Sequence, residues 1–470
     1  MPEVTSGADP WPTAVRPYDR PVPLVVLAHG SPGLAGDGVP GPALYVGAVV
    51  AALLGVVALR ARGAAPLGGP AVAPLSLDGA EAGPWPGDAL PSPARVAGQA
   101  VGLAALALTL AVAWLGSDLL GLNPVPLALR LVWWTVPLLA LLLGDWWRVV
   151  DPHDALAGLV DRVRGRARPG PQGLDVDDEA GDWWVPALLL ASFAWMATCW
   201  IEGLRPRNLA LWLTLVTLVL LVGAAVGGRR WVRRCSPLAV LCGTIAAASP
   251  VAWSGGRVTL RSPLRGLAAR AGGRRSLAAL SVVLGATFWE SVSGTQWWSD
   301  LSGGSGDQAL IWSTLGLAWC TLLVAGAWVL VGRATEQVAA RAGGPEPEEP
   351  LGPDMAAALG PLAAVGVFAH QLSTWLIDVQ DVVVLGLDPF SQGWGLVDTS
   401  TWRADEAVLS AGVTSWLALA LVAGALALGL VASWDRVASR CGAAVLQAGW
   451  VLGAWTAGVG ALALWLLLGA

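Results

Sequence analysis

The 470-residue chain contains no lysine, so its 28 basic residues are all arginine. Charge is scarce: charged residues make up 13% of the sequence, against roughly 25% in soluble domains. Hydrophobic residues make up 55%, and the mean hydropathy is +0.62. This balance excludes an ordinary soluble domain and indicates an integral membrane protein whose partner is the lipid bilayer. The formal net charge of −5 is too small to indicate a nucleic-acid partner.

Cysteine is also scarce, and the five cysteines are scattered without a C-x-x-C pair. Cys199, Cys320 and Cys441 lie in or beside apolar stretches and are interpreted as small hydrophobic residues. Neither a disulfide framework nor a thiolate metal site is predicted. The chain also lacks a P-loop, a G-x-G-x-x-G between strand and helix, a G-x-S-x-G and an H-E-x-x-H. These absences remove the commonest ATP-driven, dinucleotide-binding and serine-hydrolase classes.

What the chain has instead is about ten apolar stretches long enough to cross a bilayer, for which about 17–25 residues are needed. They are residues 42–60, 96–116, 126–145, 183–203, 208–227, 276–292, 308–332, 355–377, 407–432 and 443–468. Tryptophan numbers 28, and Trp146/Trp147, Trp183/Trp184 and Trp297/Trp298 sit near predicted span ends, as in an interfacial belt.

The arginines predict how these spans are oriented. They gather in linkers 61–95, 146–182, 228–275 and 333–354 and in the turn 433–442, whereas the alternate loops are poor in arginine. Positively charged loops stay on the cytoplasmic side. We therefore expect a single all-α polytopic bundle of about ten spans over 42–470, in the cell membrane. Both termini are expected outside, with 1–41 as an extracytoplasmic segment.

The stretch 236–254 is apolar but short, and arginine clusters flank it on both sides. If it spanned the membrane, one cluster would lie outside and every later loop would be inverted. It is therefore predicted to be an interfacial or re-entrant cytoplasmic element.

The chain has three histidines, and the span 355–377 holds one of them beside other polar residues. His370, Thr374 and Asp378 follow an i, i+4, i+8 spacing, which places them on one face of a continuous helix. A histidine oriented by a carboxylate is used for metal ligation or proton transfer. The alternative is a histidine that only makes a hydrogen bond between helices.

More carboxylates fall at the same predicted outer side. Glu290 lies near the end of 276–292, Glu202 ends 183–203, and Asp118 ends 96–116. His29 is also predicted outside, and would become the mature N-terminus if the short apolar run 21–28 were a cleaved leader. His370, Asp378 and Glu290 are the candidate catalytic residues. His29, His370 and Asp378 are candidate ligands of a divalent metal ion.

At the predicted inner surface, the stretch 144–156 reads GDWWRVVDPHDAL. Asp145, Arg148 and Asp151 are expected to form a local ion-pair network, and Pro152 to begin a new helical turn. His153 is expected in water or lipid headgroups. This stretch is interpreted as a structural cap where a helix leaves the membrane.

Several stretches resemble a family of integral membrane proteins from high-GC bacteria known as fenitrothion hydrolases. The matching pieces include AHG (28–30), LLLGDWWRVVDPHDAL (141–156), GRRWVRRCSPLAVLCG (228–243), GATFWESVSGTQWW (285–298), FAHQLSTWLIDVQ (368–380), LDPFSQGWGLVDT (387–399) and ASWDRV (432–437). The chain departs from the family at Trp289, where the family has aspartate, at Gln371, where it has tyrosine, and at Ser433, where it has histidine. The resemblance implies hydrolysis of an organophosphorus triester with release of a nitrophenol.

Three classes of function stay open at this point. The first is a membrane-embedded hydrolase with an outward site made of His370, Asp378 and Glu290, in which a divalent ion activates water. The second is an ion- or proton-coupled transporter that uses the same residues to bind a small molecule or ion. The third is a structural protein whose buried polar groups only hold helices together.

Overall fold

The computed structural model describes residues 41–64, 92–165, 179–254, 257–270, 272–303, 308–346, 349–394, 402–405 and 408–468. His29 and most of the predicted N-terminal segment lie outside the described residues.

The described residues are almost entirely helical, with one small hairpin. The long helices are α1 (Gly41–Arg62), α3 (Ser92–Leu115), α4 (Val125–Leu143), α9 (Pro206–Cys235), α12 (Arg274–Ser293), α14 (Ala309–Arg341), α18 (Ala411–Cys441) and α19 (Val445–Leu468). The shorter ones are α5 (Trp147–Val150), α6 (Pro152–Val163), α7 (Glu179–Asp182), α8 (Val185–Thr198), α10 (Pro237–Ile245), α11 (Pro263–Ala269), α13 (Gln296–Leu301), α15 (Leu351–Asp354), α16 (Gly360–His370) and α17 (Leu372–Gly386). Short 3₁₀ turns are η3 (Leu120–Leu122), η4 (Ala246–Ala248), η6 (Ala356–Leu359) and η7 (Gly442–Ala444). Strands β1 (Val251–Ser254) and β2 (Arg257–Leu260) pair antiparallel, with Val251 opposite Leu260.

Six helical stretches among the described residues are long and apolar enough to cross a membrane. They are Pro93–Leu115, Val125–Leu143, Pro206–Ala248, Arg274–Ser293, Ala309–Arg341 and Gly412–Leu462, and the bent pair Ala356–His370 with Leu372–Gly386 makes a seventh if it counts as one span. Large apolar side chains point outward from them: Leu322 on α14 is 71% exposed and Val222 on α9 is 63% exposed. Apolar surface along helices of this length is typical of contact with lipid. The chain is therefore an all-α helical membrane protein.

The centre of the bundle is α12, which packs against α8, α10, α14 and α16. Its Gly285 allows a close approach to α14, because a Cβ atom there would lie 2.5 Å from Cα of Thr321. The segment 236–254 enters this centre as α10, η4 and β1. Leu241 and Ile245 of α10 are fully buried. With nine residues, α10 is too short to span a bilayer alone, since about 20 residues are needed.

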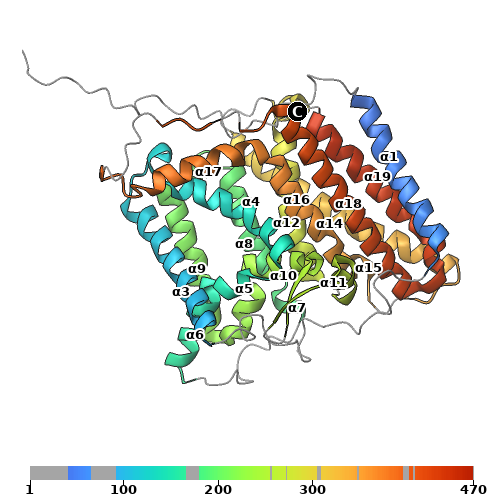
Figure 1. The fold of residues 1–470 in the computed structure, drawn as a ribbon, viewed down its shortest axis with the longest axis horizontal. Helices are drawn as coiled ribbons and strands as arrows, with labels where there is room; N and C mark the ends of the chain where they lie inside the picture. Colours follow the sequence, from blue (N-terminus) through green and yellow to red (C-terminus); the bar gives the residue numbers. More distant parts are fainter. Residues whose placement is uncertain are drawn as a thin grey trace, which may run out of the picture.

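The two ends of the bundle differ (Figure 1). Helix α17 lies across one end, which we call the α17 end, and α5, α6, α11 and α15 lie toward the other, the arginine-rich end. Ion pairs at the arginine-rich end join segments that are far apart in the chain. Arg62 Nη2 lies 3.3 Å from Asp435 Oδ1, Arg436 Nη2 lies 2.6 Å from Asp354 Oδ1, and Arg275 pairs with Asp182.

Candidate functional site

A break in the helical chain forms the centre of the candidate site. Helix α16 ends at His370, α17 begins at Leu372, and the two axes differ by 70°. Gln371 between them leaves helical geometry, with φ −101° and ψ 9°. The prediction of one continuous helix over 355–377 is therefore wrong, and His370 and Asp378 do not share a helix face.

Contacts with α4 explain the direction that α17 takes after the break. The indole of Trp375 donates a hydrogen bond to Thr135 Oγ1 at 2.8 Å. One turn further, Asp378 faces Arg130, which is also on α4. Two polar contacts with the same neighbouring helix hold α17 across the end of α4 instead of in line with α16 (Figure 1).

Three side chains converge at the break. His370 Nε2 lies 3.8 Å from Glu290 Oε2, and Gln371 Nε2 donates to the same oxygen at 2.9 Å. The His370 side chain is 12% exposed and that of Glu290 is 27% exposed, so the pair is sheltered but reachable. Two of the three predicted catalytic residues thus meet, although they are far apart in the chain: Gln371, next to His370, lies 81 residues after Glu290. Such contacts between helices follow from burial of polar groups in an apolar bundle.

Asp378, the third predicted catalytic residue, has a different partner. Its Oδ2 lies 2.7 Å from Arg130 Nη2, with side-chain exposures of 7% and 15%. The Arg130 guanidinium also lies over the ring of Trp134, with 5.6 Å between Cζ and the ring centroid. His370 is therefore placed beside Glu290, and the prediction that a carboxylate eight residues on orients it is wrong.

Arg130 is the residue that sequence reasoning missed. It lies inside the span Val125–Leu143, which is otherwise apolar or hydroxyl-bearing, and it interacts electrostatically with Glu290 as well as with Asp378. The signal was present in the sequence, because a lone arginine inside an apolar span is expensive and marks a functional hypothesis. The mean hydropathy of the span is high enough that this single arginine does not lower it below that of a membrane helix.

The described part of the candidate donor set does not gather around one metal position. Among the described residues, no group of three His, Cys, Asp or Glu side chains comes together where a metal could bind. Asp378 already neutralises a guanidinium, which would repel a cation at that carboxylate. His29 lies outside the described residues, so the ligand set His29, His370 and Asp378 stays a prediction and no chemical step is derived through it.

Two other carboxylates that were predicted at the outer side make surface contacts and do not contact His370 or Glu290. Asp118 accepts a hydrogen bond from the backbone N–H of Arg207 at 2.9 Å. Glu202 pairs with Arg205 at 3.0 Å, and both side chains are about half exposed, at 48% and 51%. Exposed pairs of this kind contribute little to stability.

At the arginine-rich end, Asp151 in the stretch 144–156 caps the N-terminus of α6. Asp151 Oδ1 accepts hydrogen bonds from the backbone N–H of His153 at 2.9 Å and of Asp154 at 3.4 Å, and Pro152 begins α6. Burial opposes ionisation of Asp151, but hydrogen bonds from His153 and Ser236 outweigh it and lower the pKa of this carboxyl. His153 was expected in water or headgroups, which is wrong: its side chain is 12% exposed, and Nε2 lies 3.3 Å from Thr217 Oγ1.

Of the predicted network of Asp145, Arg148 and Asp151, the ion pair of Asp145 and Arg148 is present, with 2.7 Å between Oδ2 and Nε. Asp151 accepts a hydrogen bond from Ser236 Oγ at 2.8 Å in addition to its bonds to α6. Both side chains converge on Gly243 of α10, where a Cβ atom would lie 2.7 Å from Arg148 Nη2. Arg270 donates to the carbonyl of Gly243. Burial lowers the pKa of Arg270 to about 10, helped by the charge of Arg148, and burial raises the pKa of Asp145. These groups tie α10 to the segments around it.

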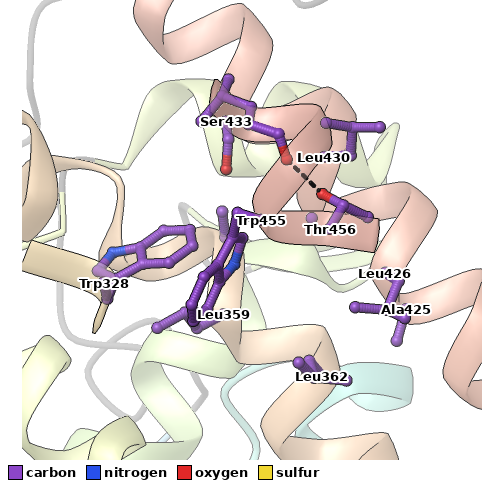
Figure 2. A pocket seen from close by; sticks show the side chains of 12 residues that line it. Trp328, Leu359, Leu362, Ala425, Leu426, Leu430, Ser433, Trp455 and Thr456 are labelled. Carbon is purple, nitrogen blue, oxygen red and sulfur yellow. Dashed lines mark hydrogen bonds between the residues drawn. The ribbon is translucent and has the colours of Figure 1, made fainter. Parts of the chain in front are cut away.

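The stretch ASWDRV (432–437) places some of its residues at a crevice and others in the ion pairs of the arginine-rich end. Ser433 lines an apolar crevice between α14, α16, α18 and α19, walled by Trp328, Leu362 and Trp455 (Figure 2). The Thr456 hydroxyl beside it donates to the carbonyl of Leu452 at 2.8 Å. Glu290, His370 and Asp378 are not among the residues that line the crevice. Asp435 and Arg436 lie at the arginine-rich end, where they form ion pairs with Arg62 and Asp354.

Fold and site together define a helical membrane protein in which a sheltered histidine and glutamate lie side by side at a broken helix. No family model, no curated protein and no solved structure matches the chain. The resemblance to fenitrothion hydrolases therefore stays a prediction.

Proposed function

We propose that the chain crosses the cell membrane about ten times, with both termini outside and the arginine-rich end in the cytoplasm. The ion pairs Arg62–Asp435, Asp354–Arg436 and Asp182–Arg275 support this, because each joins two segments that the positive-inside rule assigns to the cytoplasmic side.

Single cysteines test this topology. Ser299 near the α17 end and Ala340 near the arginine-rich end are both exposed. In intact cells a membrane-impermeant maleimide should label Ser299→Cys and spare Ala340→Cys, and in inside-out vesicles the pattern should reverse. The parent chain serves as background, since four of its five cysteines are buried. Equal labelling of both variants in intact cells contradicts the topology.

We further propose that the site at the helix break binds and releases protons as part of a proton-coupled transporter. The observation that carries this proposal is the contact of Glu290 with His370 at the break between α16 and α17. Broken helices in transporters place backbone ends and ionisable side chains at a binding site inside the membrane domain. Ionisable groups inside such a domain face its interior and mark ion or proton pathways.

The geometry supports sharing of one proton between the two groups. With the proton on His370 the pair is an imidazolium and a carboxylate, and with the proton on Glu290 it is a neutral acid facing a neutral imidazole. The distance of 3.8 Å exceeds that of a hydrogen bond, so the groups exchange a proton only after a small approach. Gln371 donates to Glu290 in either state and holds the carboxyl in place.

Proton flux into proteoliposomes tests the proposal. Under an imposed inward pH gradient, the parent protein should acidify the lumen, as read by a trapped pH dye. Glu290→Gln should lower the flux by about tenfold or more, since general acid–base groups typically contribute factors of about 10²–10⁴. Glu202→Gln, which removes an exposed carboxylate at the same end, should leave it unchanged. Equal flux for the parent chain and Glu290→Gln contradicts a proton site at Glu290.

A membrane-embedded hydrolase is the second candidate, favoured by the same Glu290–His370 contact and by the resemblance. His370, oriented by Glu290, would accept a proton from water while the water oxygen bonds to phosphorus. The bond from phosphorus to the nitrophenol oxygen breaks, and nitrophenolate leaves with the electron pair. Nitrophenol release by membranes should then disappear in His370→Gln and Asp378→Asn at equal expression. Unchanged release in either variant counts against this candidate.

A further inference from the structure

Arg130 has more hydrogen-bonding capacity than its surroundings use. A guanidinium carries five N–H donors in a planar fork. One nitrogen, Nη2, pairs with Asp378, and Nε is shielded from solvent without a hydrogen-bond partner. In an apolar bundle, buried donors without acceptors are costly, and their presence points to an acceptor that binds there.

The ion pair itself is also incompletely formed. Asp378 Oδ2 lies 2.7 Å from Arg130 Nη2, yet this oxygen is buried without a hydrogen bond of acceptable geometry. Two parallel N–H···O bonds would be the strongest arrangement for an arginine and a carboxylate. Nε therefore retains an unused donor, which a second planar or tetrahedral oxyanion can accept once it displaces the groups that shield this atom.

The net charge of the site determines whether an anion binds there alone or together with a proton. With both carboxylates ionised and His370 neutral, Glu290, Asp378 and Arg130 sum to one negative charge, which repels an anion. One proton on Glu290 or His370 brings the sum over these three groups to zero and weakens this repulsion. Asp381 on α17 adds a further negative charge, so the proton lowers the repulsion without abolishing it, and α8 and α14 bring only the thiols Cys199 and Cys320.

On the basis of the proposed function, we infer that Arg130 binds a small oxyanion, a carboxylate or phosphate, and that a proton binds at Glu290 and His370 together with it. The solute and the proton then enter the site as a neutral pair. By linkage, the proton raises the affinity for the anion as much as the anion raises the affinity for the proton. The side-chain exposures of 15% for Arg130 and 27% for Glu290 leave the site open to one side.

The test uses the purified full-length chain in detergent with acetate and inorganic phosphate as separate probes. Anion binding is measured calorimetrically, and proton uptake is followed with a pH dye in weakly buffered solution. The parent chain should bind at least one probe and take up protons as it does so. Its affinity should rise between about pH 8 and pH 6, by a factor within the roughly 5- to 150-fold range of coupled sites.

Variants distinguish anion binding at Arg130 from proton binding at Glu290 and His370. Glu290→Gln should bind the anion at least as tightly as the parent chain but without proton uptake. Arg130→Gln should lose anion binding, and Arg205→Gln, at an exposed arginine of the same end, should retain it. Because Arg130→Gln leaves Asp378 unpaired, the double variant Arg130→Gln with Asp378→Asn checks that the loss is not a folding defect.

Failure of this inference differs from failure of a proton site. If neither acetate nor phosphate binds the parent chain, or if Arg130→Gln binds them as the parent does, the oxyanion site is wrong even where Glu290→Gln abolishes proton flux. Anion binding without proton uptake also overturns the coupling. Proton flux that is unchanged in Glu290→Gln contradicts the proposed function itself, whatever Arg130 binds.

Discussion

Arg130 on α4 and Asp378 on α17 approach to 2.7 Å between Nη2 and Oδ2, with side-chain exposures of only 15% and 7%. This pair holds the helix that follows the break across the end of α4 (Figure 1). It also lies within electrostatic range of Glu290, and so links the bend of the chain to the charge of the site.

Asp378→Asn should therefore destabilise the protein, since it leaves the Arg130 charge without a counterion. Breaking a buried pair costs about 3–5 kcal/mol, and the partial exposure of Arg130 places the expected loss near about 3 kcal/mol. The double variant with Arg130→Gln should recover part of this loss. The measurement is thermal unfolding in detergent of the parent chain, the two single variants and the double variant. Additive losses in the double variant would show that the two side chains do not stabilise each other.

The close contact of α12 with α14 gives a second prediction. Gly285→Ala should destabilise the bundle by about 1–3 kcal/mol, as overpacking does, because the new methyl group would meet backbone atoms of Thr321. Gly326 on α14 is the matched control, since nothing lies within 4 Å of its Cβ position. Gly326→Ala should be neutral or stabilising by up to about 1 kcal/mol. Similar midpoints of thermal unfolding for the two variants would contradict this packing.

Asp354 anchors two arginines at the arginine-rich end. Its carboxylate accepts from Arg436 at 2.9 and 2.6 Å and from Arg440 at 3.0 Å, and the residue is 4% exposed. Asp354→Asn should cost about 3–5 kcal/mol, because two guanidiniums lose their shared counterion. Glu349→Gln, an exposed carboxylate nearby in the chain, should cost less than about 0.5 kcal/mol. A small and equal effect of both substitutions on thermal stability would count against this anchor.

Asp151 makes a stability contribution with a defined dependence on pH. Its pKa in the folded protein lies below the ordinary 3.8, so the contribution is complete above that value and is lost as pH falls through the lowered pKa. Asp151→Ala should cost about 1 kcal/mol, typical of the loss of an N-cap. The difference from the parent chain should stay constant between about pH 6 and 8 and shrink only below about pH 4. A difference that changes near neutral pH would contradict the lowered pKa.

Hydropathy alone predicted several helices within a few residues. The stretches 126–145, 276–292 and 443–468 correspond to Val125–Leu143, Arg274–Ser293 and Val445–Leu468. Other boundaries failed where tertiary contacts intervene. The predicted span 183–203 ends as a helix at Thr198, where Thr198 and Cys199 bond to Ala194 and Ser313. The span 355–377 breaks at Gln371, because α17 turns to meet α4.

The candidate site was only half predictable. That Glu290, His370 and Asp378 belong to one end of the bundle followed from span order and arginine placement, which are properties of the linear chain. Which of them touch did not follow, because a partner is chosen by the rotation of each helix and by its neighbours. His370 meets Glu290, and Asp378 meets Arg130, a residue hidden by the apolar average of its span.

The sequence by itself determined the class of the protein and the distribution of its charge, because partition into lipid depends on composition and on runs of about 20 apolar residues. Only the tertiary structure decided the pairing of its few buried polar groups and the bend that brings them together. A buried charge takes whichever partner the packing of the helices brings within reach, and no local pattern in the chain specifies that partner.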